Sequence, residues 1–154
     1  MPSHSLTVPR RPRILLVDDD CEVLNALERV LRRAEPRWEV LTAVDGIEAL
    51  AVLDEEAIDV LVTDLHMPKM DGFRLLTRLA RSHPETVRIV HSSHTATLGT
   101  ELIRYLAHNV LTKPAAYHDV ITMLRWATGV AASLPPRAEA LQDQSLRPGR
   151  SSPR

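Results

Sequence analysis

The chain turns from apolar to acidic within seven residues, Ile14-Leu15-Leu16-Val17-Asp18-Asp19-Asp20. A short run of valine, isoleucine and leucine is typical of a strand that is buried on both faces of a sheet. Comparable runs recur along the chain. We therefore expect strands at 14–17, 38–43, 58–63, 88–92 and 110–112.

Each of these runs is followed by apolar residues at helical spacing, which predicts helices within 23–34, 47–53, 73–79, 97–106 and 118–132. Parallel strands need crossover connections, so five repeats of strand and helix indicate an α/β fold. We expect a doubly wound, flavodoxin-like sheet of five parallel strands, (βα)5, in the strand order 2-1-3-4-5.

The 154 residues, 44% of them hydrophobic and 25% charged, have the size and composition of one globular domain. Seven of the eleven prolines and seven arginines fall at the two ends. We expect flexible tails at 1–12 and 134–154 around a domain at 13–133. Residues 14–133 hold 12 basic and 18 acidic groups, a net charge of −6, so we expect no nucleic-acid partner.

Several classes of protein are disfavoured by what the sequence contains. Its apolar runs are far shorter than the ~18 residues of a membrane span, and its N-terminus does not resemble a signal peptide. A single cysteine, Cys21, requires no oxidising compartment, so we expect a cytoplasmic protein without a membrane partner. Five widely separated glycines do not fit a phosphate-binding loop or a dinucleotide fingerprint.

Ligands of such sheets bind outside the carboxyl ends of the strands. The polar residues expected there are Asp18, Asp19, Asp20, Asp64, Ser92 and Lys113. Adjacent carboxylates repel one another unless a cation or a proton intervenes. Asp20 suits the N-cap of the following helix, and Asp18 and Asp19, with Asp64, suit Mg²⁺. A purely capping role for this acidic run remains the alternative.

Asp64 can be a metal ligand only, or a nucleophile toward a phosphorus atom whose charge the metal neutralises. Lys113 favours the second reading, because its ammonium could bind a phosphoryl oxygen in the same pocket. The Ser92 hydroxyl could donate to that group as well. Taken alone, Lys113 would be a surface lysine and Ser92 a turn residue.

Four motifs carry a resemblance to a known family. They are Ile14 to Asp20, Asp64-Leu-His-Met-Pro-Lys-Met-Asp-Gly72, Ile89-Val-His-Ser92-Ser93 and Leu111-Thr-Lys113-Pro114. In this order and spacing they resemble the receiver domain of two-component response regulators, over about residues 13–132. The chain looks like a stand-alone, chemotaxis-regulator-like member.

The resemblance implies a role for each matching residue. Asp64 would be the phosphoacceptor, supplied by a sensor histidine kinase or a histidine phosphotransfer protein, and Ser92 and Lys113 would contact the phosphoryl group. Pro114 matches a proline that is usually cis. The implied Mg²⁺ ligands are Asp18, Asp19, Asp64 and the backbone carbonyl of His66.

The implied function is that of a single-domain response regulator and phosphoprotein. It would not be an enzyme beyond its own phosphoryl transfer and dephosphorylation. It would signal through phosphorylation-dependent contact with a downstream protein at the face of the fourth helix, fifth strand and fifth helix, or pass the group on in a phosphorelay. We expect a monomer or a weak homodimer.

Two departures leave alternatives open. Val110 stands where receivers usually carry an aromatic residue, and Leu106-Ala107-His108-Asn109 replaces the usual glycine-alanine turn. One alternative is therefore a receiver-fold binding module that no longer switches. Another is a haloacid-dehalogenase-like phosphatase with Asp18 as nucleophile, which leaves the motif from Asp64 to Gly72 unexplained.

Two histidines border the expected site. His66 lies two residues after Asp64, and His94 lies two residues after Ser92. One hypothesis is that they set the lifetime of an acyl phosphate by acting on the attacking water. The alternative is that both are solvated loop residues.

Overall fold

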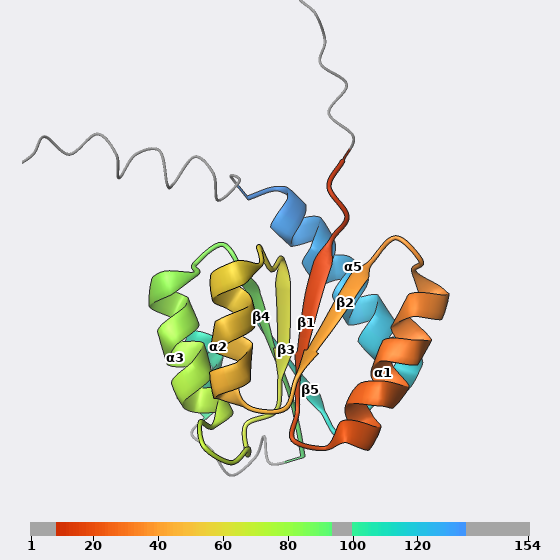
Figure 1. Cartoon of the computed structure of the whole chain (residues 1–154). Helices are drawn as coiled ribbons and strands as arrows, with labels where there is room; N and C mark the ends of the chain where they lie inside the picture. The colour runs from red at the N-terminus through yellow and green to blue at the C-terminus, as the bar shows by residue number, and fades with distance from the viewer. Residues whose placement is uncertain (1–8, 94–99, 135–154) are drawn as a thin grey trace, which may run out of the picture.

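The computed structural model describes residues 9–93 and 100–134. Its strands are β1 (Arg13–Val17), β2 (Glu39–Ala43), β3 (Val60–Thr63), β4 (Val87–Ser92) and β5 (Asn109–Thr112). All neighbouring strands pair in parallel, in the order β2-β1-β3-β4-β5 (Figure 1). The predicted sheet and its strand order are confirmed.

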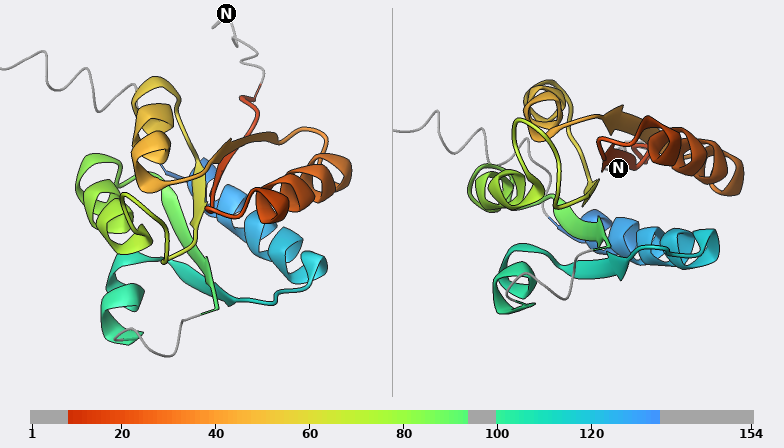
Figure 2. Two further views of the ribbon diagram at one scale, coloured as in Figure 1. Left: turned by 60° about the horizontal axis from the view of Figure 1, so that its bottom comes forward. Right: turned by 90° about the horizontal axis from the view of Figure 1, so that it is seen from below.

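The five helices are α1 (Cys21–Ala34), α2 (Gly46–Glu55), α3 (Gly72–Ser82), α4 (Thr100–Leu106) and α5 (Tyr117–Ala132). Helices α1 and α5 cover one face of the sheet, and α2, α3 and α4 cover the other (Figure 2). None of the helices in the described ranges combines the length and apolar character that crossing a bilayer needs. The expectations for His94, for residues 97–99 and for most of both tails lie outside the described residues.

Alternate residues of the strands build two separate cores. In β1, Leu15 and Val17 pack toward α2, α3 and α4, whereas Ile14 and Leu16 pack toward α1 and α5. All four side chains are 2% exposed or less. This double burial explains why the strands read as continuous apolar runs.

Aspartate side chains begin three of the helices. The Asp20 carboxylate accepts hydrogen bonds from the backbone N–H groups of Glu22 and Val23, which confirms it as the N-cap of α1. Asp45 caps α2 and Asp71 caps α3 in the same way. Each capped helix begins near the end of the sheet at which β1, β2 and β3 finish.

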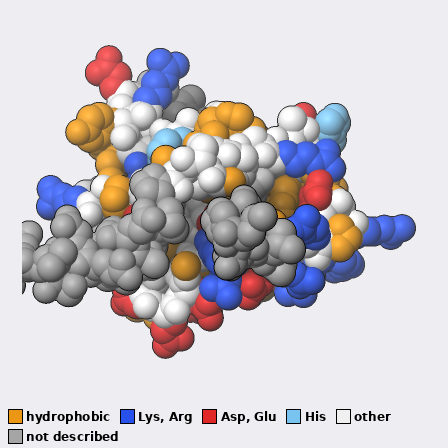
Figure 3. All heavy atoms as spheres, turned by 90° about the horizontal axis from the view of Figure 1, so that it is seen from above, with side chains coloured by type: hydrophobic (Ala, Val, Ile, Leu, Met, Phe, Trp, Pro, Cys, Tyr) orange, Lys and Arg blue, Asp and Glu red, His pale blue; other side chains and the backbone are white. Residues whose placement is uncertain are grey.

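The opposite end of the sheet carries both ends of the described chain, at the top of Figure 1. Figure 3 looks onto that end and shows basic and acidic side chains interspersed. Arg10 pairs with Asp59 at 2.5 Å, and Arg13 pairs with Glu39 at 2.9 Å and with Glu56 at 2.8 Å. These two N-terminal arginines are therefore engaged with acids of the folded domain.

Strand β4 buries three polar side chains, Arg88, His91 and Ser92. The Arg88 guanidinium donates to the carbonyl oxygens of Leu106 (2.7 Å) and Thr86 (3.3 Å), and its backbone N–H donates to His108 Nδ1. Arg88 thus ties β4 to the segment that precedes β5. The Nε2 atom of His91, in contrast, is buried and has no hydrogen-bond partner among the described residues.

Gly72 lets α3 begin directly against the end of β3. Its N–H donates to the carbonyl oxygen of Leu65 at 2.9 Å. A Cβ atom at position 72 would lie 2.1 Å from the carbonyl oxygen of Asp64 and 2.8 Å from Leu65 Cα. Because these are backbone atoms, a side chain here forces the loop after β3 to move.

Gly72→Ala is therefore expected to lower the free energy of unfolding by about 1–3 kcal/mol or more. Gly129→Ala is the matched control, because a Cβ there meets nothing within 4 Å and the position is an exposed site inside α5. The control should stabilise the protein by about 0.5–1 kcal/mol. Urea denaturation measures both values, and equal effects at the two positions would contradict the packing argument.

The burial of His91 predicts a pH-dependent stability. Burial and the nearby Lys113 ammonium lower the pKa of His91, while Asp18 and Asp64 act in the opposite direction. The unfolded chain, with a histidine pKa near ~6.5, binds the proton first as the pH falls. The free energy of unfolding should therefore decrease below about pH 6.5.

His91→Val is expected to reduce this decrease, measured by urea denaturation at several pH values with a chelator present. Part of the decrease should remain, because burial and Arg88 also lower the pKa of His108. Gly129→Ala provides the control, because it changes no titratable group and should leave the pH profile as it is. An identical profile in His91→Val and in the wild type would refute the prediction.

Candidate functional site

The carboxyl ends of β1, β3 and β5 bring Asp18, Asp64 and Lys113 together. Backbone hydrogen bonds continue one residue beyond each strand, from Asp18 N–H to Ala43 (3.1 Å), from Asp64 N–H to Val17 (3.0 Å) and from Lys113 N–H to Ser92 (3.0 Å). The sheet itself therefore fixes the backbone from which these side chains project. The carboxyl ends of these strands are at the lower end of the sheet in Figure 1.

Lys113 joins two carboxylates. Its Nζ donates to Asp18 Oδ2 at 2.5 Å and to Asp64 Oδ2 at 3.2 Å. The three side chains are mostly buried, with 21%, 6% and 14% of Lys113, Asp18 and Asp64 exposed. Burial alone would lower the pKa of Lys113, but Asp18 and then Asp64 outweigh it, so that the pKa is raised.

The Asp64 carboxylate is held in its ionised form. Burial acts to raise its pKa, but the hydrogen bond from Ser92, the charge of Lys113 and the Leu65 N–H together lower it. The Leu65 N–H lies 2.7 Å from Asp64 Oδ1. A mostly buried carboxylate with these partners is anionic at neutral pH, the form in which a carboxylate can act as a nucleophile.

Asp18, Asp19 and Asp64 form a cluster of candidate metal ligands. Each offers one carboxylate oxygen, and these oxygens lie within 4.8 Å of one another. Asp19 is exposed, so the cluster is open to solvent on one side. Hard oxygen donors with room for waters fit Mg²⁺. The structure brings these three sequence-predicted ligands together.

Other expected residues lie around this cluster. Ser92 is fully buried at the end of β4, and the Lys113–Pro114 peptide bond is cis, as the resemblance implies. His66 is exposed in the loop after Asp64, and the role of its carbonyl stays a prediction. Val110 is half-buried and packs against the core under α2, α3 and α4.

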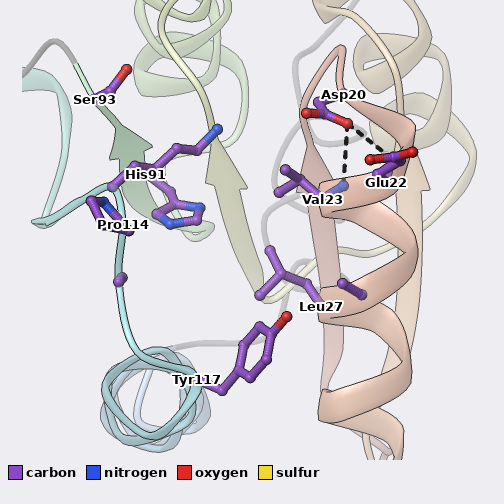
Figure 4. Close-up of a pocket in the computed structure, with 11 residues that line it drawn as sticks. Asp20, Glu22, Val23, Leu27, His91, Ser93, Pro114 and Tyr117 are labelled. Atoms are coloured by element: carbon purple, nitrogen blue, oxygen red, sulfur yellow. Dashed lines mark hydrogen bonds between the residues drawn. The ribbon is translucent and has the colours of Figure 1, made fainter.

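Two features of the site region were not anticipated from the sequence. His91 lies one residue before Ser92, on the α1 and α5 side of the sheet (Figure 4). The available signal was a histidine directly after the apolar pair Ile89 and Val90. Lys69 adopts a left-handed backbone conformation with φ of 65°, and its ammonium lies 3.5 Å from the Asp45 carboxylate. This contact links the loop after β3 to the start of α2.

Comparison with known sequences identifies relatives. The response regulator receiver domain matches residues 14–125. Protein-glutamate methylesterase/protein-glutamine glutaminase 4 of Anaeromyxobacter dehalogenans is 38% identical over 115 residues, which cover 73% of this chain and 32% of the relative. The transcriptional regulatory protein PrrA of Mycobacterium tuberculosis is 50% identical over 68 residues, 44% of this chain and 28% of the relative. The chain thus spans about a third of the length of these curated relatives.

Solved structures agree with this assignment. The signal receiver domain of an HD domain-containing protein from Pseudomonas fluorescens is 30% identical, with a TM-score of 0.73 over 84% of this chain and 96% of that one. The chemotaxis response regulator CheY4 of Vibrio cholerae is 27% identical, with a TM-score of 0.68 over 75% and 98%. The chain therefore belongs to the response regulator receiver domain family of two-component signalling.

Proposed function

We propose that Asp64 accepts a phosphoryl group from a phosphohistidine of a sensor histidine kinase or a histidine phosphotransfer protein. The observation that carries this proposal is the ionised Asp64 carboxylate beside the Lys113 ammonium and the Ser92 hydroxyl. Membership of the receiver family supports it.

In the proposed reaction, an Asp64 carboxylate oxygen attacks the phosphorus atom. An oxygen–phosphorus bond forms, the nitrogen–phosphorus bond breaks, and its electron pair returns to the donor imidazole. Lys113 and Ser92 provide the positive charge and the hydrogen bond for the phosphoryl oxygens. The product is an aspartyl phosphate on Asp64.

Asp18, Asp19, Asp64 and the backbone carbonyl of His66 would hold Mg²⁺ in this scheme. When bound, Mg²⁺ supplies positive charge next to the transferred phosphoryl group. Asp18 Oδ1 accepts the backbone N–H of Asp20 at 2.9 Å, so the side chain is held with Oδ2 toward Lys113 and Asp64. In this orientation the Asp18 carboxylate could contact both Lys113 and a bound Mg²⁺.

We further propose that the signal leaves through the α4, β5 and α5 surface. Lys113 lies between β5 and α5, and Ser92 ends β4, which pairs with β5 and precedes α4 in the chain, so both proposed phosphoryl contacts adjoin this surface. It exposes Leu102, Tyr105 and Trp126, side chains suited to binding a downstream protein. A monomeric or weakly dimeric cytoplasmic protein without catalytic output, or a phosphorelay intermediate, fits this scheme.

The two alternatives differ in their support. Asp18 as a phosphatase nucleophile is disfavoured, because its side chain is less exposed than that of Asp64, 6% against 14%. A binding module that does not switch is favoured by Val110, which is aliphatic and half-buried where the family usually has an aromatic residue. Phosphorylation assays separate these possibilities.

The first test is intact-mass spectrometry of the full chain with Mg²⁺ and a small phosphoramidate donor. We expect one phosphoryl adduct on the wild type and none on Asp64→Asn. Asp71→Asn is the matched control, since Asp71 follows in the same loop but caps α3, a role that asparagine also fills. It should retain the adduct.

Each other outcome has a defined meaning. An adduct that survives Asp64→Asn and disappears in Asp18→Asn would support the phosphatase reading. A folded wild-type protein without any adduct would support the binding module.

The metal site predicts opposite effects for two substitutions. Asp19→Asn removes a carboxylate and should weaken Mg²⁺ binding at least about tenfold. The Lys113 ammonium pairs with Asp18 and Asp64, two of the candidate metal ligands. Lys113→Met removes this positive charge, so Mg²⁺ should bind more tightly. Isothermal titration calorimetry measures both affinities.

Lys69→Met is the control for Lys113→Met, because its ammonium pairs with Asp45, which is not part of the cluster. It should leave the Mg²⁺ affinity unchanged. Weaker binding in Lys113→Met would argue against shared carboxylates.

A further inference from the structure

Thr63 is a fully buried polar residue at the end of β3, directly before Asp64. The other three residues of the strand are apolar. A hydroxyl group buried in such surroundings costs free energy unless it forms a hydrogen bond. The Thr63 Oγ1 atom donates to the backbone carbonyl oxygen of Asp64 at 2.8 Å. The hydroxyl group therefore has a defined partner, which belongs to the proposed phosphoacceptor.

The carbonyl that Thr63 contacts is part of the peptide group between Asp64 and Leu65. In a trans peptide group the C=O and the N–H lie in one plane and point in opposite directions. The N–H of this group is that of Leu65, which donates to Asp64 Oδ1 at 2.7 Å. The Thr63 hydroxyl thus fixes the orientation of the peptide group that holds one oxygen of the Asp64 carboxylate.

The two hydrogen bonds at this peptide group strengthen each other. A carbonyl that accepts a hydrogen bond polarises its peptide group and makes the N–H a better donor. The other carboxylate oxygen, Asp64 Oδ2, accepts a hydrogen bond from the Lys113 ammonium at 3.2 Å. The Asp64 carboxylate is therefore held at both oxygens, and its orientation depends on the Leu65 N–H as well as on Lys113.

Gly72 acts on the same carbonyl group. A Cβ atom at position 72 would lie 2.1 Å from the Asp64 carbonyl oxygen. The absence of a side chain at Gly72 gives this oxygen the room that it needs in its present orientation. The Thr63 hydroxyl then binds it there.

We propose that Thr63 is a positioning residue for phosphoryl transfer to Asp64. Its hydroxyl sets the direction in which the Asp64 carboxylate faces the phosphorus atom, through the peptide group between Asp64 and Leu65. Attack on phosphorus needs an oxygen aligned with the leaving nitrogen, so a rotated carboxylate reacts more slowly even when it is ionised. Thr63 is buried and acts through Asp64, not on the phosphoryl group. This inference rests on the proposed phosphoryl transfer.

Thr63→Val tests this role, because valine has the shape of threonine without the hydroxyl group. The rate of adduct formation with Mg²⁺ and a small phosphoramidate, followed by intact-mass spectrometry, should fall about tenfold. Thr63→Ser keeps a hydroxyl group and should recover most of the lost rate.

Thr86→Val is the matched control. The Thr86 hydroxyl is also buried and donates to a backbone carbonyl oxygen, that of Ile58 at 3.0 Å. These residues precede β4 and β3, so the contact lies at the end of the sheet opposite to Asp64. Urea denaturation should show a loss of stability in Thr86→Val as in Thr63→Val. The rate of adduct formation in Thr86→Val should equal that of the wild type.

The amide proton signal of Leu65 reports on the peptide group directly. A short hydrogen bond to a carboxylate places this signal downfield in NMR spectra. We expect it to move upfield in Thr63→Val, to return toward its original position in Thr63→Ser and to stay in place in Thr86→Val. The spectra are recorded without a phosphodonor, so this measurement does not depend on phosphorylation.

Three results would overturn the inference while leaving the proposed function intact. They are a phosphorylated wild type with equal rates in Thr63→Val and Thr86→Val, a rate in Thr63→Ser as low as that in Thr63→Val, and an unchanged Leu65 amide signal in Thr63→Val. A folded wild type that forms no adduct would overturn the proposed function, and the role of Thr63 with it.

Discussion

The charge balance at Lys113 is the interaction on which the site depends. Asp18 and Asp64 leave neighbouring strands of a buried sheet, where two carboxylates repel each other strongly. The Lys113 ammonium donates to both and offsets this repulsion. Asp18 also binds the start of α1 through the Asp20 N–H, and Lys113 leads into α5. The same contact therefore joins the two helices on one face to the acidic end of the sheet.

Much of this arrangement follows from the sequence, because a strand buried on both faces leaves a continuous apolar run and a polar residue at its end. This pattern predicts that Asp18, Asp64 and Lys113 lie together at the carboxyl ends of the strands. Strand boundaries were less exact. The sequence predicts Trp38 within the second strand. In the structure its N–H donates to the Glu35 carbonyl oxygen in a turn, and β2 begins one residue later.

Features that depend on tertiary packing were not predictable in this way. His91 is one of three polar residues in β4, and the burial of its Nε2 atom depends on packing against parts of the chain that are far away in the sequence. The left-handed backbone of Lys69 is equally hidden, because lysine has no preference for that conformation. The guanidinium of Arg88 is buried against carbonyl groups, where its sequence position suggested only a strand residue.

The placement of the chain ends gives the fold a modular character. The described chain begins before β1 and ends after α5, and both ends lie at the end of the sheet opposite to the carboxyl ends of the strands (Figure 1). Strands of four to six residues separate the two sides, a span on the order of 15–20 Å. A neighbouring domain joined to either end would thus begin at a distance from the acidic cluster. This geometry lets a domain be joined to either end of the receiver without covering the acidic cluster.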